Sequence, residues 1–232
     1  MDKYQILTIA LAILLILIII VLSSRVRIYK TYQKYMKVGN KADITGKQLA
    51  FFSKQKLGLD DLSFSLTDKK LGDAYSPKYK TLILSKEVCD TASLASMAIV
   101  AHELGHAMQD DEKKPLFVFV RVLGYIVRFT NKFILPMLIV GLFLYAFKYP
   151  TPDLGYYFII SAIILFILNI LNQILNIPIE FDASKRALKF LKENKIVSTS
   201  ELRKAKKLLT IAGQTYIAGL FDNLFIITRR KK

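Results

Sequence analysis

The chain has 232 residues, of which 53% are hydrophobic, and 34 Lys and Arg against 18 Asp and Glu give a formal net charge of +16. A soluble domain of this size rarely contains so much apolar sequence, so the composition indicates a membrane protein. A charge of this size could indicate nucleic-acid binding, but the basic residues flank long apolar runs, as in the cytoplasmic segments of membrane proteins. We therefore expect a partner in the lipid bilayer and none in nucleic acid. The single cysteine, Cys89, excludes an internal disulfide.

The first 24 residues are predicted to form a transmembrane helix. The run from Tyr4 to Ser24 has no charged side chain, and at about 1.5 Å per residue it can cross a bilayer core of roughly 30 Å. A cleaved signal peptide is disfavoured because only Lys3 lies before the run as a basic residue and no small-residue cleavage site follows. The basic residues that come next place the following segment in the cytoplasm by the positive-inside rule: Arg25, Arg27, Lys30, Lys34 and Lys37.

Residues 25–115 are predicted to form a cytoplasmic α+β segment. Thr45 and Gln48 fit a capping box, and Leu62–Thr67 alternates apolar and polar residues as a half-buried strand does. In chain order we expect a helix over 45–56, a strand at 62–67, a loop at 68–80, a strand at Thr81–Ser85, and a helix from Thr91 or Ser93 through Gln109.

Residues 116–180 are predicted to form an interfacial helix and a transmembrane hairpin. In the apolar stretch Leu116–Lys132, Arg121 and Arg128 lie seven apart and therefore share one helix face. The runs 133–147 and 154–177 carry no charge, and the turn Pro150–Asp153 separates them. Both ends of this hairpin are expected on the cytoplasmic side.

Residues 181–232 are predicted to form a basic helix and a C-terminal hydrophobic helix. Ser198 and Glu201 fit a second capping box. The apolar run 208–228 is interrupted by polar residues and is followed by four basic ones, so a spanning orientation would break the positive-inside rule. We therefore predict three transmembrane helices and leave a fourth open. The expected fold class is a mainly helical α+β integral-membrane protein, multi-pass in the cell membrane.

His102-Glu103-Leu104-Gly105-His106 is an HExxH motif. Residues four apart share a helix face, so both imidazoles can bind one Zn²⁺, while Glu103 is offset and can act as the general base on an activated water. The chain has just two histidines. Their chance placement around a Glu at this spacing occurs on the order of once in several thousand sequences.

A catalytic zinc site needs a third protein ligand and an open position. No histidine is left and Cys89 stands alone, so this ligand should be a carboxylate, and we predict Glu180. It closes the hairpin that returns the chain to the side of the histidines. A polar stripe on the same helix face also leads to it, and such a stripe in lipid must face protein or a wet cavity: Asn169, Asn172, Gln173 and Asn176. Interhelical hydrogen bonding is the alternative explanation of these amides.

Four segments resemble the YugP-like family of membrane-bound neutral zinc metallopeptidases, and the resemblance covers most of the chain. They are Leu71–Pro77 with Thr81–Ser85, Ala101–Gln109 (AHELGHAMQ), Ile177–Leu188 (IPIEFDASKRAL), and a closing segment with Leu208, Thr210, Ala212 and Tyr216. The resemblance implies zinc, peptidase activity and Glu180 as the third ligand of a zincin-like site. Related HtpX-like gluzincins usually carry an Asp four residues after this Glu. Here Ser184 stands there, so a role in orienting a ligand is not implied for it.

The predicted function is a zinc-dependent membrane endopeptidase whose active site faces the cytoplasm and whose substrates are peptides or proteins, membrane proteins included. One alternative is a site-2-type intramembrane protease in which Asp222 completes the site. Another is a non-catalytic zinc-binding scaffold, which would more commonly use a closed set of four ligands. For substrate binding we expect strand addition along Thr81, Leu82, Ile83, Leu84 and Ser85. Candidates for stabilising the transition state are Tyr75, Tyr216 and Arg186.

Overall fold

The computed structural model describes residues 19, 23, 26–148 and 152–219, with the backbone alone for 152 and 214–219. Most of the run 4–24, and Asp222 in the closing apolar run, lie outside the described residues. The chain divides into two compact units. The first comprises 1–114 together with 178–232, and the second comprises 115–177.

The helices of the first unit begin where the local sequence signals predict. The capping box of α2 (Gly46–Leu57) is present, because Gln48 N donates to Thr45 Oγ1 at 3.2 Å and Thr45 N donates to Gln48 Oε1 at 2.8 Å. Ser93 caps α4 (Leu94–Asp111) through its side chain. Residues 26–36 are helical, and the remaining helices of this unit are the short α3 (Lys86–Asp90), the last part of α6 (Pro152–Glu193) and α7 (Thr199–Gly219).

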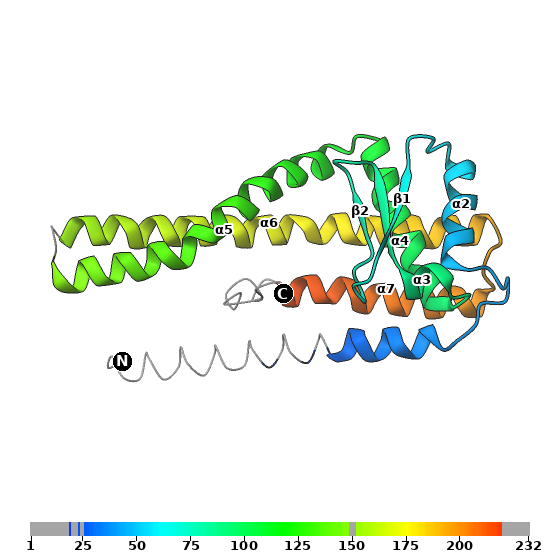
Figure 1. Cartoon of the computed structure of the whole chain (residues 1–232). Helices are drawn as coiled ribbons and strands as arrows, with labels where there is room; N and C mark the ends of the chain where they lie inside the picture. The colour runs from blue at the N-terminus through cyan, green and yellow to red at the C-terminus, as the bar shows by residue number, and fades with distance from the viewer. Residues whose placement is uncertain (1–18, 20–22, 24–25, 149–151, 220–232) are drawn as a thin grey trace. The chain divides into compact units, whose positions relative to one another are not determined.

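A three-stranded sheet in the order β1-β3-β2 lies against α4 (Figure 1). β1 (Ser63–Thr67) and β3 (Thr81–Ser85) were expected, and they pair in parallel. β2 (Ala74–Ser76) falls in the segment predicted as a loop, and it pairs antiparallel with β3. Because β3 is hydrogen-bonded to a neighbour on both sides, it has no free edge for a substrate strand. The expectation that a substrate pairs along Thr81–Ser85 is therefore wrong.

One hydrophobic core holds the first unit together. α4 supplies its centre, and its buried residues contact α2, α3 and α7 as well as the sheet. Burying side chains of this size stabilises a fold by about 1.5–3 kcal/mol each. The largest completely buried hydrophobic side chains come from residues 26–36, α2, β3, α4 and α6: Tyr32, Leu49, Leu82, Leu94, Met97, Leu104 and Leu191.

The second unit consists of α5 (Pro115–Phe147) and the first part of α6. α5 is one continuous helix, so the predicted division between an interfacial helix and a separate span is not observed. α6 likewise continues through Pro178 to Glu193 instead of ending with the apolar run. Among the described residues, these two helices are long and apolar enough to cross a membrane. Neither helix is interrupted by the proline in its interior, Pro136 in α5 and Pro178 in α6.

Two kinds of contact join α5 to α6 within the second unit. At Gly141 an added Cβ would lie 2.9 Å from the backbone nitrogen of Ile159, so glycine permits the close approach. Asn169 Nδ2 donates to Asn131 Oδ1 at 2.9 Å, and Gln173 Nε2 donates to Asn169 Oδ1 at 3.0 Å. Within the predicted polar stripe, Asn169 therefore makes an interhelical hydrogen bond, and Gln173 bonds to Asn169 within α6.

Candidate metal centre

Two helices of the first unit supply the candidate metal centre, and a glycine lets them approach. Gly105, inside the HExxH motif on α4, lies against α6 so closely that an added Cβ would be 2.5 Å from the carbonyl oxygen of Ala183. This approach sets Glu180, three residues before Ala183, against the histidine face of α4. Gly105, which the HExxH motif leaves unspecified, thus has a role in packing the two helices.

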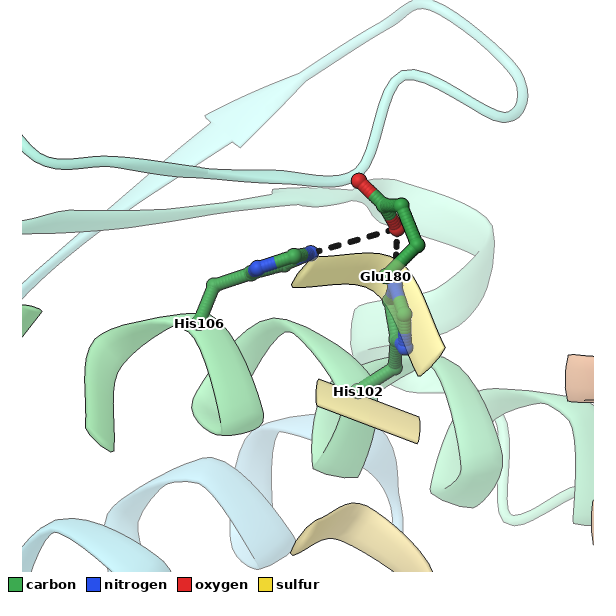
Figure 2. Close-up of side chains that lie close together, drawn as sticks. All are labelled: His102, His106 and Glu180. Carbon is green, nitrogen blue, oxygen red and sulfur yellow. Dashed lines mark hydrogen bonds and ion pairs between the residues drawn. The ribbon is translucent and has the colours of Figure 1, made fainter. Parts of the chain in front are cut away.

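His102, His106 and Glu180 converge, as Figure 2 shows. The Nε2 atom of His102 lies 3.1 Å from Glu180 Oε2, and the Nε2 atom of His106 lies 3.4 Å from the same oxygen. The three side chains are 14%, 12% and 8% exposed, respectively. Around a tetrahedral Zn²⁺ with bonds of about 2.0–2.2 Å, two ligand atoms lie roughly 3.3–3.5 Å apart. Both distances fall within a few tenths of an ångström of this spacing, and all three ligand atoms lie within 4.8 Å of one another, so this donor set could hold a zinc ion.

The carboxylate of Glu180 changes the protonation of His106. Burial by itself would lower the pKa of this imidazole, but the hydrogen bond and the charge of Glu180 outweigh burial and raise the pKa to about 9. Without a metal, His106 therefore carries a proton at neutral pH. The proton on His106 then provides the positive charge beside Glu180 that a bound cation would otherwise provide.

The other ring nitrogen of each histidine also has a protein partner. His102 Nδ1 lies 3.2 Å from the hydroxyl of Ser184, and His106 Nδ1 lies 3.0 Å from Oε1 of Gln109. Ligand histidines are typically oriented in this way. Ser184 thus contacts a histidine although the resemblance to the HtpX-like enzymes implied no such role.

Glu103 lies beside the histidine face rather than on it, as its position in the motif predicts. Its Oε2 accepts a hydrogen bond of 2.8 Å from the backbone N–H of Tyr75 in β2. This N–H points away from β3, because successive residues of a strand direct their backbone groups to opposite sides, and β2 pairs with β3 through the residues on either side of Tyr75. The free edge of β2 therefore faces the motif.

The other predicted site residues do not join this group. The hydroxyl of Tyr75 donates to Asp110 at 2.8 Å, and its backbone N–H contacts Glu103. All three guanidinium nitrogens of Arg186 are engaged by carboxylates, Nε by Asp182 and the other two by Glu112. This leaves Arg186 poorly suited to an oxyanion in the site. The side chains of Tyr216 and Asp222 lie outside the described residues.

Sequence reasoning did not single out Gln109 as a partner of His106, or Ser184 as a partner of His102. Gln109 follows His106 by three residues on one helix and Ser184 follows Glu180 by four, so helical periodicity could have placed both on the site faces. A signal of that kind names many residues, and only the packing of α4 on α6 selects these two.

Comparison with known proteins agrees with this geometry. A family model described as "Putative neutral zinc metallopeptidase" matches residues 9–230. The chain belongs to this family. A "Putative membrane protease YugP" of Bacillus subtilis (strain 168) is 28% identical over 207 residues, which cover 89% of this chain and 88% of that protein. No solved structure matches the chain. Membership in a zinc peptidase family and the gathered His102, His106 and Glu180 both indicate zinc as the metal.

Proposed function

We propose that the protein is a zinc-dependent membrane endopeptidase whose active site faces the cytoplasm. The observation that carries this proposal is the convergence of His102, His106 and Glu180 at distances suited to zinc, with Glu103 alongside. Two imidazoles and one carboxylate leave a fourth position open for water or substrate, as catalytic zinc sites do. This open position favours an enzyme over a scaffold that keeps zinc for structure.

His102 and His106 would bind zinc through Nε2, and Glu180 would bind it through its carboxylate. When bound, the metal lowers the pKa of a coordinated water and polarises the carbonyl of the scissile peptide. Glu103 accepts the proton of the attacking water and delivers it to the departing amine. The N–H of Tyr75 orients the Glu103 carboxylate for both transfers.

The substrate would bind as an added strand on β2 rather than on β3. β2 is an edge strand, and its outer edge faces the motif, where the N–H of Tyr75 contacts Glu103. That N–H would stay with Glu103, and the substrate strand would pair with the remaining main-chain groups of this edge. An extended peptide on this edge would place its backbone beside the three ligand side chains. Main-chain pairing recognises any extended peptide, which suits an endopeptidase.

The apolar surface of the second unit supports a membrane location. Core helices of soluble proteins are mostly buried. In the most apolar 18-residue stretch of each helix, only 6% is buried in α5 and 11% in α6. Neither helix lies at the N-terminus, so a signal sequence does not explain them. From the Lys and Arg excess of residues 25–114 and 178–207 we infer that these segments lie on the cytoplasmic side, with the predicted turn Pro150–Asp153 outside.

The experiment combines metal analysis with cleavage of a peptide library by protein purified in detergent. Wild type should contain one zinc per chain and cleave peptides. Glu103→Gln should keep its zinc and lose cleavage, because a general base is removed while every ligand stays. Glu180→Ala should lose zinc, and Asp222→Ala should keep it.

Three outcomes would contradict parts of the proposal. Zinc retained in Glu180→Ala and lost in Asp222→Ala would replace it by the site-2-type alternative. Zinc with no cleavage of any peptide would favour the scaffold. Wild-type cleavage by Glu103→Gln would remove Glu103 from its assigned role.

A further inference from the structure

Gln109 is a buried polar side chain at the back of the candidate metal centre. It is 2% exposed and follows His106 on α4. Its Oε1 lies 3.0 Å from His106 Nδ1, and its Nε2 donates to the carbonyl oxygen of Ile179 and to Oδ2 of Asp182, each at 2.9 Å. Nothing in the HExxH chemistry requires an amide here.

These contacts determine which way the amide points. Amide oxygen and nitrogen are often assigned from their neighbours. Here both neighbours of Nε2 can only accept, since one is a backbone carbonyl and the other a carboxylate. A flipped amide would set Oε1 of Gln109 against these two oxygens. This buried oxygen would then have no donor, which costs about 1–3 kcal/mol or more.

The orientation of the amide in turn determines the proton on His106. Oε1 of Gln109 can only accept, so Nδ1 of His106 must carry the hydrogen. Nε2 is then the nitrogen left to face Glu180, which it does at 3.4 Å. The same assignment holds whether the imidazole is neutral or protonated, because both forms can carry hydrogen on Nδ1.

Asp182 is itself held in place. Nε of Arg186 donates to its Oδ2 at 2.8 Å, and the remaining guanidinium nitrogens of Arg186 form a two-pronged contact with Glu112. Paired guanidinium contacts of this kind are strong and geometrically restrictive. The series Glu112, Arg186, Asp182, Gln109 and His106 therefore connects α4 and α6 twice, once at each end.

We propose that Gln109 is a positioning residue that presents His106 Nε2 to the metal, and that Asp182 is the anchor that keeps the Gln109 amide from turning. The proposal rests on the zinc site proposed above. Gln109 touches neither metal nor substrate, and it acts through the imidazole. Replacing groups that orient metal-binding histidines typically costs 10–100-fold in metal affinity.

The first test measures zinc affinity by competition with a chromophoric chelator. Gln109→Met keeps the length of the side chain and removes every hydrogen bond, and it should weaken zinc binding by roughly 10–100-fold. Gln55→Met is the matched control, since it makes the same change at an exposed position of α2 in the same unit. Equal zinc affinity in Gln109→Met and the control would overturn the proposal.

A charge exchange tests the anchor even if Gln109→Met fails to fold. Gln109→Glu keeps an acceptor for His106 but opposes its carboxylate to Asp182, so zinc binding should weaken. Adding Asp182→Asn supplies an amide donor to that carboxylate, and the double variant should recover about tenfold relative to Gln109→Glu. No recovery in the double variant would reject the anchor role.

A measurement without metal separates this proposal from the peptidase assignment. The chain has two histidines, so ¹⁵N-histidine labelling of untagged protein reports two imidazoles. At neutral pH, wild type should show a slowly exchanging Nδ1–H for His106, and Gln109→Met should lose it. If wild type bound no zinc, the proposed function would be contradicted, but the Nδ1–H signal of His106 would still test whether Gln109 orients the imidazole. Fast exchange in wild type would overturn the proposal.

Discussion

Adding one methyl group at Gly105 tests whether the α4–α6 contact holds the ligands together. In Gly105→Ala the new Cβ would lie 2.5 Å from the carbonyl oxygen of Ala183, where ordinary contact begins near 3.4 Å. The difference between these distances, about 0.9 Å, must be taken up by the two helices because the obstacle is backbone. Metal–ligand distances tolerate only about 0.2 Å. A separation of this size therefore carries Glu180 out of reach of a zinc held by His102 and His106.

The effects on stability and on zinc affinity should differ. Replacing Gly by Ala inside a helix gains about 1 kcal/mol, while overpacking costs about 1–3 kcal/mol, so the net loss of folding free energy is modest. Zinc affinity should fall by at least the roughly 10–100-fold seen when ligand geometry is disturbed. Thermal unfolding of the metal-free protein and chelator competition measure the two quantities.

Gly213→Ala on α7 is the control, because its Cβ would meet the ring of Phe181 at an ordinary 3.8 Å. It should keep wild-type zinc affinity and be up to about 1 kcal/mol more stable. If Gly105→Ala also bound zinc with wild-type affinity, the helix contact would not control the ligand spacing, and the reasoning from Gly105 would be refuted.

Three further predictions concern protons, substrate and topology. Because the pKa of metal-free His106 is raised to about 9, zinc binding at pH 7 should release about one proton from this imidazole, and the apparent zinc affinity should rise with pH up to about 9. Calorimetry in buffers of different ionisation enthalpy measures the number of protons released. No proton release at pH 7 would contradict the prediction. Tyr75→Pro should lower the cleavage rate roughly tenfold or more with zinc retained, because Glu103 loses its N–H partner. Tyr75→Phe, which removes the hydroxyl that donates to Asp110 and keeps the backbone N–H, should cleave nearly as wild type. Equal rates in the two variants would reject the role of the N–H. Pro152→Cys in a Cys89→Ser background should react with an impermeant thiol reagent from outside the cell, and labelling from the cytoplasm alone would reject the hairpin orientation.

Features that depend on nearby residues were predictable from the sequence. The capping boxes at Thr45 and Ser198 are present, as their three-residue spacing indicated. The spacing of His102 and His106 places them on one face of α4. Glu180 lies beside them in the structure, as a hairpin returning the chain to the histidines suggested.

Features that depend on distant contacts were not predictable in the same way. β2 has three residues, too few for a periodic signal, and its existence depends on pairing with β3. This pairing makes β3 central, which excluded it as the substrate strand. The charges of Arg121 and Arg128 suggested an interfacial helix, yet the backbone of α5 continues past them without a break. The contact between Gln109 and Asp182 likewise exists only once α4 and α6 have packed.

The order of the ligands along the chain has a consequence for biosynthesis. A ribosome delivers His102 and His106 first, then both helices of the hairpin, and only afterwards Glu180. A nascent chain that ends anywhere in α5 or early in α6 holds two imidazoles and Glu103 but no third ligand, so it binds zinc weakly and cannot assemble a complete site. If the protein acts as proposed, the long insertion would delay hydrolytic activity until the hairpin has been synthesised. A peptidase with its ligands in this order would be inactive during the interval in which its own unfolded segments, and those of neighbouring nascent chains, are most exposed to cleavage.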